Sequence, residues 1–261
     1  MKRIVFSLFV FALIFFGKIN LLAGAAFSDV KIIHQDDHEI ILEWRPQNFQ
    51  LQARQINGRQ VQIISFENAI ARNRPGQPDI PYRILSVGLP SLQSAVITVL
   101  NIRAHTVNNV VLAPVPVVYK DRSGISREQY VFNDSVYQSN VPFPQAIVKS
   151  ASPAMFRDLP LQSIRISPVQ FNAYDQKLTV YDYIRIKITF QGKPATGQRL
   201  VRKELLDDVA RAFVLNFDQA RKWRVVRKPL LKKAAQLPSG SYYRITVKED
   251  GLYKVTAAML E

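Results

Sequence analysis

The chain has 261 residues, 48% of them hydrophobic, and its 35 Lys and Arg against 20 Asp and Glu give a formal net charge of +15. It contains no cysteine, which excludes a disulfide scaffold, a thiolate zinc site and a cysteine nucleophile within these residues. The length and apolar content allow one large domain, or one medium domain with additional segments.

The N-terminus has the pattern of an export signal. Lys2 and Arg3 precede an apolar run, Ile4–Phe16, and small residues follow, with Ala23 and Ala25 in an A-x-A arrangement. We therefore expect residues 1–25 to be a cleaved signal peptide and the protein to reach the periplasm, the cell surface or the medium. The alternative is a retained membrane anchor, but a span needs roughly 20 apolar residues and this run is shorter. Any membrane contact is expected only through the uncleaved signal.

Short apolar runs separated by turn signals follow the leader. The pattern predicts strands at Val30–Ile33, Ile40–Trp44, Gln60–Phe66, Leu92–Ile102 and Asn109–Tyr119. Prolines 114 and 116 make the last of these an edge or bulged strand, because proline donates no ladder hydrogen bond. Three prolines within residues 74–81 predict a rigid, extended connection.

The stretch Gln162–Phe190 predicts two strands folded over one turn. Asn172–Asp175 supplies turn-forming side chains. Beyond the turn, apolar residues fall on even positions, which predicts one buried face. The residues of this face are Leu178, Val180, Ile184, Ile186, Ile188 and Phe190.

Together these elements predict a mainly β protein, with an antiparallel β-sandwich or jelly-roll-like domain at residues 26–192. Residues 193–237 are expected to form a helix and a basic linker. The helix is expected within Val201–Arg224, where apolar residues recur at 3–4 spacing: Leu205, Val209, Ala212, Phe213 and Phe217. The strand–turn–strand pattern of Ser241–Lys254 predicts that residues 238–261 begin a second β domain.

Candidate catalytic or metal-binding groups are few. His34 and His38 flank acidic residues in a polar turn, which is the composition of a cation site but equally of an exposed turn. His105 has no nucleophile beside it in the sequence, and Asp207 and Asp208 are adjacent, so on a helix they do not face each other. Trp44 and Trp223 are expected to be packing residues. We expect no metal and no cofactor.

Positive charge is concentrated near the C-terminus. Residues 199–233 contain eleven Lys or Arg and four Asp or Glu. Basic clusters are typical of nucleic-acid binding, but no nucleic-acid motif accompanies this one and the protein is expected to be exported. A solvated linker or a processing region is the preferred interpretation, and no nucleic-acid partner is expected.

Three segments together resemble the N-terminal region of gingipain-type cysteine peptidase precursors, including the sortase-like peptidases of type IX secretion. Gly76–Pro81 resembles the family's G-x-P-x-[LI]-P segment, and Ile164–Asn172 with Leu178–Tyr181 resembles the end of its propeptide. Tyr243–Lys254 resembles the segment that follows the propeptide, and Phe213–Phe217 fits the helix between them. Phe171, Asn172 and Ala173 depart from the pattern by lacking the proline often found after the asparagine.

The resemblance implies an exported propeptide that keeps a cysteine endopeptidase latent and assists its folding until proteolysis removes it. The peptidase's His–Cys dyad has no counterpart here, so the chain itself is not expected to be an enzyme. Its partner would be the cognate peptidase domain, in cis or in trans. Gingipains cut after Arg or Lys, so a basic side chain of the propeptide is expected to occupy the specificity pocket or mark a processing site. The candidates are Arg221, Lys222, Arg227, Lys228, Lys232 and Lys233.

Two alternatives remain open at this point. The six basic residues are also what an ordinary solvated linker would carry. The whole chain is also compatible with a free-standing β-sandwich module of the cell envelope that binds a protein or a glycan.

Overall fold

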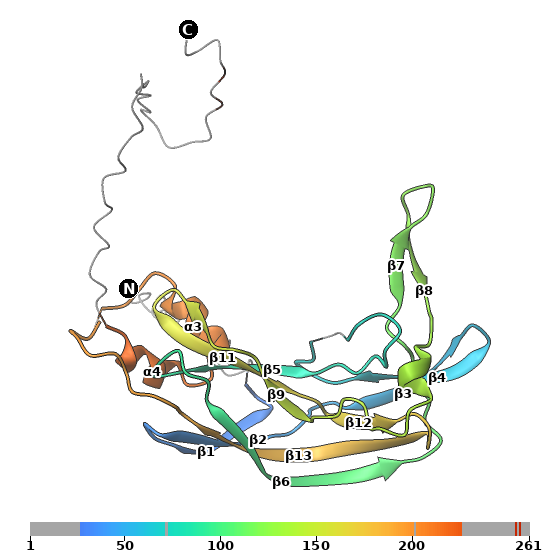
Figure 1. Cartoon of the computed structure of the whole chain (residues 1–261), viewed down its shortest axis with the longest axis horizontal. Helices are drawn as coiled ribbons and strands as arrows, with labels where there is room; N and C mark the ends of the chain where they lie inside the picture. Colours follow the sequence, from blue (N-terminus) through green and yellow to red (C-terminus); the bar gives the residue numbers. More distant parts are fainter. Residues whose placement is uncertain (1–26, 71–72, 201, 226–253, 255, 257–261) are drawn as a thin grey trace, which may run out of the picture. The chain divides into compact units, whose positions relative to one another are not determined.

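The computed structural model describes residues 27–70, 73–200 and 202–225, together with Lys254 and Thr256. The predicted signal peptide, with Ala23 and Ala25, lies outside the described residues, and so does nearly all of the predicted second β domain. Within the described part, the chain is mainly β and its strands pair antiparallel (Figure 1). None of the helices described there has the length and hydrophobicity of a membrane span.

The larger sheet has five strands and is built around a long central one. Its members are β1 (Val30–Gln35), β2 (Glu39–Trp44), β13 (Lys177–Thr189), β12 (Val169–Asn172) and β6 (Val96–Val107). Strand β13 pairs with β2 and β12 along one edge and with β6 along the other. The β1–β2 hairpin confirms the strands predicted on either side of the polar turn at residues 34–38.

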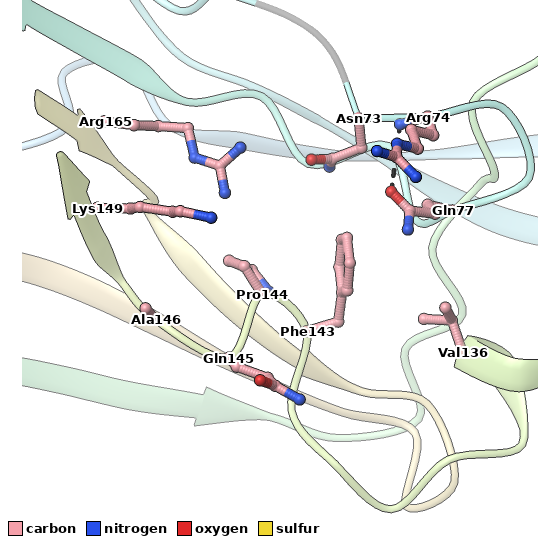
Figure 2. A pocket seen from close by; sticks show the side chains of 10 residues that line it. All are labelled: Asn73, Arg74, Gln77, Val136, Phe143, Pro144, Gln145, Ala146, Lys149 and Arg165. Carbon is pink, nitrogen blue, oxygen red and sulfur yellow. Dashed lines mark hydrogen bonds between the residues drawn. The ribbon is translucent and has the colours of Figure 1, made fainter. Parts of the chain in front are cut away.

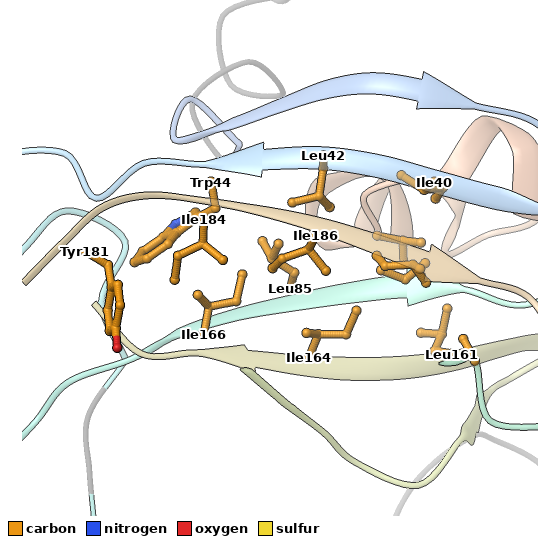
Figure 3. Packing of buried hydrophobic residues seen from close by; sticks show 14 of the residues in the cluster. Ile40, Leu42, Trp44, Leu85, Leu161, Ile164, Ile166, Tyr181, Ile184 and Ile186 are labelled. Carbon is orange, nitrogen blue, oxygen red and sulfur yellow. The ribbon is translucent and has the colours of Figure 1, made fainter. Parts of the chain in front are cut away.

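A smaller sheet lies against the larger one. Its four strands are β5 (Arg83–Gly88), β9 (Val148–Ser150), β10 (Ala154–Phe156) and β11 (Leu159–Ile166). Strand β11 pairs with β5 on one side and with β9 and β10 on the other. Figure 3 shows Leu85, Ile164 and Ile166 from this sheet pointing towards Leu42 and Ile186 of the larger sheet.

The core between the two sheets follows directly from alternation. All six even-numbered apolar residues predicted from Leu178 to Phe190 are buried, which confirms the predicted face of β13. Each fully buried Ile or Leu contributes roughly 1.5–3 kcal/mol relative to an exposed side chain. The predicted turn is also correct, because the Asn172 side-chain oxygen accepts the N–H of Asp175 at 3.1 Å.

The structure corrects one point about Gln162–Phe190. The segment holds three strands, and β11 belongs to the smaller sheet instead of pairing with β13. Ser167 and Pro168 form the crossing between the sheets. Proline has no N–H for a ladder, and the Ser167 hydroxyl donates to the Val169 carbonyl at 2.8 Å, so the local bonds favour a corner here.

Two further hairpins complete the strands: β3 (Gln50–Ile56) with β4 (Arg59–Ser65), and β7 (Val117–Lys120) with β8 (Ser126–Gln129). The prediction for residues 109–119 was only partly right. The described strand begins at Val117, and the earlier residues make isolated contacts such as the Pro78–Pro114 bridge. The strand predicted at residues 92–102 begins instead at Val96 and continues to Val107.

The helix predicted within residues 201–224 is only partly right, because the structure divides it into short pieces. The segment forms α3 (Asp207–Phe213), α4 (Phe217–Ala220) and a 3₁₀ helix, η1 (Arg221–Trp223). Leu205 and Val209 of the predicted apolar stripe are exposed. The helix is interrupted because the intervening residues bond to β5: the Leu215 N–H donates to the Ser86 carbonyl at 2.9 Å.

Candidate functional site

The β7–β8 hairpin is the most exposed element of the described chain. Figure 1 shows it projecting away from the two sheets. Every residue of both strands is exposed, including the apolar side chains Val117, Val118 and Tyr119. A hairpin that covers no core of its own domain has its side chains available for another surface.

The turn of this hairpin is ordered by Asp121. One oxygen of its carboxylate accepts the N–H groups of Ser123 at 2.9 Å and Ile125 at 3.0 Å, and the other accepts from Arg127 Nε at 2.9 Å. Gly124 has φ +77°, a backbone conformation that favours glycine. The bond from Arg127, followed by the backbone bonds, lowers the pKa of Asp121. The turn is therefore held in one conformation at neutral pH.

Arg122 lies within this turn and is exposed. Its side chain makes no hydrogen bond or ion pair with any residue in the described part of the chain. The tip of the hairpin thus presents an uncompensated guanidinium on an ordered turn. Sequence reasoning did not select this residue, because a lone Arg between Asp and Ser carries no recognisable spacing.

The base of the hairpin is anchored to the domain. Phe132 packs edge-on against Tyr137 with ring centroids 4.8 Å apart, and the Arg59 guanidinium lies 5.0 Å from the Phe132 ring. Tyr137 ends the short helix α2 (Asp134–Tyr137), and its hydroxyl donates to the Leu112 carbonyl at 2.9 Å. Burial raises the pKa of Tyr137, so this hydroxyl remains a donor. The hairpin therefore projects from a fixed base.

The end of the described chain is also tied to the sandwich. The Asn216 side chain accepts the N–H of Gly88 at 2.7 Å and donates to its carbonyl at 3.0 Å. A Cβ at Gly88 would lie 2.2 Å from the Ala220 Cβ, so the close approach of α4 to β5 requires glycine. Arg224 is buried and forms a bidentate pair with Asp207 at 2.8 and 3.1 Å. The domain's ordered contacts thus extend through Arg224.

Of the six basic residues predicted from the sequence, the structure describes Arg221 and Lys222. They occupy η1, directly before buried Trp223, whose ring centroid lies 5.3 Å from that of Phe190. The pair is therefore part of the folded domain. The other four, Arg227, Lys228, Lys232 and Lys233, lie outside the described residues.

The remaining candidates form local structure. Asp36 accepts the N–H groups of His38 and Glu39, both at 2.8 Å, and contacts His34 at 3.0 Å. Its pKa falls to about 2, mainly because of the two backbone bonds. Within the described residues, no group of three or more acidic or histidine side chains is arranged to hold a metal ion.

His105 has an acidic partner that is remote in sequence: its Nδ1 lies 3.0 Å from Asp182 Oδ1 on an exposed face. Asp207 and Asp208 point to different partners, Arg224 and Lys203, as expected for adjacent helical residues. Trp44 and Trp223 are both buried, which confirms that they are packing residues.

The described domain is an antiparallel β-sandwich with a projecting hairpin and a docked C-terminal helical segment. Comparison with known families places this domain in a class. The Propeptide_C25 family model matches residues 25–225, most of the chain, and the protein belongs to this gingipain-type propeptide family.

Individual relatives are distant in sequence. Gingipain R2 of Porphyromonas gingivalis is 21% identical over 217 residues, covering 77% of this chain and 29% of the relative. Gingipain R1 of Porphyromonas gingivalis is 21% identical over 215 residues, covering 77% of this chain and 22% of the relative. The chain thus spans less than a third of the length of these relatives.

Two solved structures share the fold. A complex of Porphyromonas gingivalis RgpB pro- and mature domains aligns with a TM-score of 0.62 at 19% identity, covering 73% of this chain and 99% of the other. A structure described as giving insight into zymogenic latency of gingipain K, from Porphyromonas gingivalis, aligns with a TM-score of 0.53 at 18% identity. It covers 62% of this chain and 92% of the other. At this identity the likeness establishes the antiparallel β fold.

Proposed function

We propose that this chain is the exported propeptide of a gingipain-like cysteine endopeptidase, which it keeps latent and helps to fold until proteolysis removes it. The family assignment supports the class, and the two structural relatives are described by their titles as a pro- and mature-domain complex and a latency structure. The partner is the cognate peptidase domain, in cis or in trans. The chain contains no cysteine, so it does not supply the peptidase's nucleophile.

The observation that carries the proposal is Arg122 at the tip of the β7–β8 hairpin. A peptidase that cuts after basic residues needs a carboxylate in its specificity pocket, and a guanidinium forms charge-assisted, bidentate bonds with a carboxylate. Because Asp121 already orders the turn, little conformational entropy is lost when the hairpin docks. We assign latency to this contact. Covalent linkage would strengthen it further by raising the effective concentration.

The predicted basic pairs are assigned to removal of the propeptide. Arg221 and Lys222 lie in η1 against a buried tryptophan, so cleavage there would require local unfolding of the domain. The pairs Arg227–Lys228 and Lys232–Lys233 come in sequence after Arg224, the last residue that is buried within the described part of the chain. We therefore place the processing cut at one of these two later pairs, with Arg221–Lys222 as a slower site.

The test is inhibition of the purified cognate peptidase by the chain without its predicted leader. We expect inhibition at micromolar concentration or below, and we expect Arg122→Ala to weaken it at least about tenfold, since a charged hydrogen bond contributes roughly 1.5–3 kcal/mol. Lys120→Ala, on the same exposed hairpin, is the matched control and should inhibit like the wild type.

Equal inhibition by wild type and Arg122→Ala would refute the role of Arg122. No inhibition by the wild type at micromolar concentration would refute latency altogether and favour a free-standing module that binds a protein or a glycan. Replacing the two later basic pairs with Gln should slow removal of the propeptide, leaving only the slower Arg221–Lys222 site, without changing inhibition, and electrophoresis of the incubated precursor would show this.

A further inference from the structure

A second surface, separate from the β7–β8 hairpin, has the features of a binding site. A cleft of about 810 Å³ opens beside the smaller sheet. Figure 2 shows its walls: the loop that carries Asn73 to Gln77 on one side, strands β9 and β11 on the other, and the segment from Phe143 to Ala146 below. The residues that line it are Asn73, Arg74, Gln77, Val136, Phe143, Pro144, Gln145, Ala146, Lys149 and Arg165.

Positive charge dominates the cleft. Lys149 and Arg165 are direct partners across the β9–β11 pair, so the two cations lie side by side, and Figure 2 shows both pointing into the cavity. Like charges placed directly opposite in a sheet are destabilising. Neither side chain has an ion pair within the described residues, and no Asp or Glu lines the cleft. The site therefore has two adjacent charges that an anionic ligand would neutralise.

The guanidinium of Arg165 is held in place by an aromatic ring. Its Cζ lies 4.9 Å from the ring centroid of Tyr82. This contact fixes the plane of the guanidinium and leaves its N–H edge available for a carboxylate. The position of Arg165 is thus established before any ligand arrives.

The opposite wall carries a third cation on a rigid loop. Arg74 belongs to the proline-rich segment, and its backbone N–H donates to the Gln77 side-chain oxygen at 3.2 Å. Asn73 donates to the carbonyls of Pro78 and Ile80 at 2.9 and 3.2 Å. These bonds hold the loop that presents Arg74, while leaving the amide N–H₂ of Gln77 as an additional donor facing the cleft.

The lower wall is apolar and also preformed. Phe143 pairs through its backbone with Phe171, both bonds measuring 2.8 Å, and Gln170 donates to the Pro144 and Gln145 carbonyls at 2.9 and 3.1 Å. Phe143 and Pro144 therefore provide a fixed hydrophobic surface below the three cations. Cations above an aromatic and proline surface suit a peptide ligand. Its carboxylates can pair with the cations, and carbon atoms of its main chain or side chains can lie on the apolar surface.

We propose that this cleft binds an acidic peptide segment of a partner protein. Its carboxylates would pair with Arg165 and Lys149 on one side and Arg74 on the other, and its main chain would lie on Phe143 and Pro144. A free phosphate would use the cations but neither the apolar wall nor most of the volume. The proposal does not depend on Arg122 or on latency, since none of the hairpin residues line the cleft.

Fluorescence anisotropy with a fluorescein-labelled peptide of alternating Glu and Phe tests the proposal on the chain without its predicted leader. We expect saturable binding that is at least about tenfold tighter than that of the Gln–Phe peptide and that weakens with salt, because charge-assisted bonds are screened. The double variant K149Q/R165Q should lose binding at least about tenfold by the same argument. K177Q combined with K187Q removes the same charge elsewhere and should bind like the wild type.

The melting temperatures of the variants show whether a loss of binding reflects a loss of folding. The single variant K149Q is a second control, because it keeps the Arg165–Tyr82 contact and should still weaken binding. Equal binding of the Glu and Gln peptides, or equal loss in the control variant, would overturn the proposal. Binding of inorganic phosphate as tight as that of the Glu–Phe peptide, at an ionic strength where chloride has no effect, would overturn the peptide assignment and indicate a simple anion site.

Discussion

Strands β13 and β6 are neighbours of similar length, yet they have opposite environments. Ile184 of β13 is fully buried, whereas Ile102, its direct partner on β6, is 45% exposed. Ile186 and its partner Val99 repeat the contrast. Direct partners point to the same face of a sheet, so the difference lies in what covers them. The smaller sheet packs over β13, whereas the equivalent side chains of β6 have no such cover within the described chain.

The comparison teaches that an alternating apolar pattern creates a face but does not bury it. The apolar face of β13 is buried by a second layer, which β5 and β11 of the smaller sheet contribute. Strands β6 and β7 carry apolar residues that the fold leaves exposed. Such surfaces are typical of sites for another protein.

The substitution with the largest expected effect on stability lies in the region that the smaller sheet covers. Buried Asp29 accepts Trp44 Nε1 at 2.7 Å and Arg83 Nε at 2.8 Å. Asp29→Ala should reduce the free energy of unfolding by about 3–5 kcal/mol, because it removes the buried carboxylate that pairs with Arg83 and accepts the Trp44 N–H. Urea unfolding followed by Trp fluorescence measures this.

The control lies at the exposed boundary of β13 and β6. Asp182 pairs there with Arg103 at 3.5 Å and with His105. Asp182→Ala should cost less than about 1 kcal/mol, as exposed ion pairs usually do. Similar losses for Asp29→Ala and Asp182→Ala would show that the two regions do not differ as described.

A direct comparison uses the paired isoleucines. Ile184→Ala should destabilise the domain by about 2–5 kcal/mol, since it removes buried methylenes and leaves a cavity. Ile102→Ala, the same substitution on the same sheet face, should cost clearly less because its side chain is already partly hydrated. Equilibrium denaturation of both variants measures the two losses of unfolding free energy. A larger loss for Ile102→Ala than for Ile184→Ala would mean that β6 is the covered strand.

The smallest expected effect concerns the exposed turn between β1 and β2. The pKa of Asp36 is lowered to about 2, first by the backbone N–H groups of His38 and Glu39 and then by His34. The folded-state pKa lies below the unfolded value, so the ionised carboxylate stabilises the fold above about pH 4. This contribution is lost as the pH falls towards 2.

Asp36→Asn should therefore be less stable than the wild type at neutral pH, and the gap should narrow on acidification between about pH 4 and pH 2. Thermal melting across that pH range measures the gap. A constant gap down to pH 2 would show that Asp36 does not titrate as described.

The local predictions that proved correct concern segments whose pattern is complete within a few residues. The β1–β2 hairpin, the turn at Asn172–Asp175 and the buried face of β13 follow from alternation and turn chemistry alone. The errors arose where a distant contact competed with local propensity. The helix predicted within residues 201–224 is interrupted where Leu215 and Asn216 bond to β5, and β11 joined the opposite sheet.

The functional residues likewise separate into those that the sequence indicated and those that became apparent only from tertiary contacts. The sequence indicated a propeptide of a peptidase family through its motifs, and it drew attention to basic residues near the C-terminus. Arg122 was missed because its significance comes from the projection of the β7–β8 hairpin and the turn held by Asp121. Lys149 and Arg165 were missed because they become neighbours only when β9 pairs with β11.

By itself, then, the sequence determined the β class of this propeptide, its hairpin turns and the faces of its strands, because alternation and turn preference act over short distances. Tertiary structure decided which faces are covered, where the C-terminal helix breaks and which charges gather in one cleft. Those outcomes depend on pairings between residues far apart in the chain, whose free energy no local pattern contains.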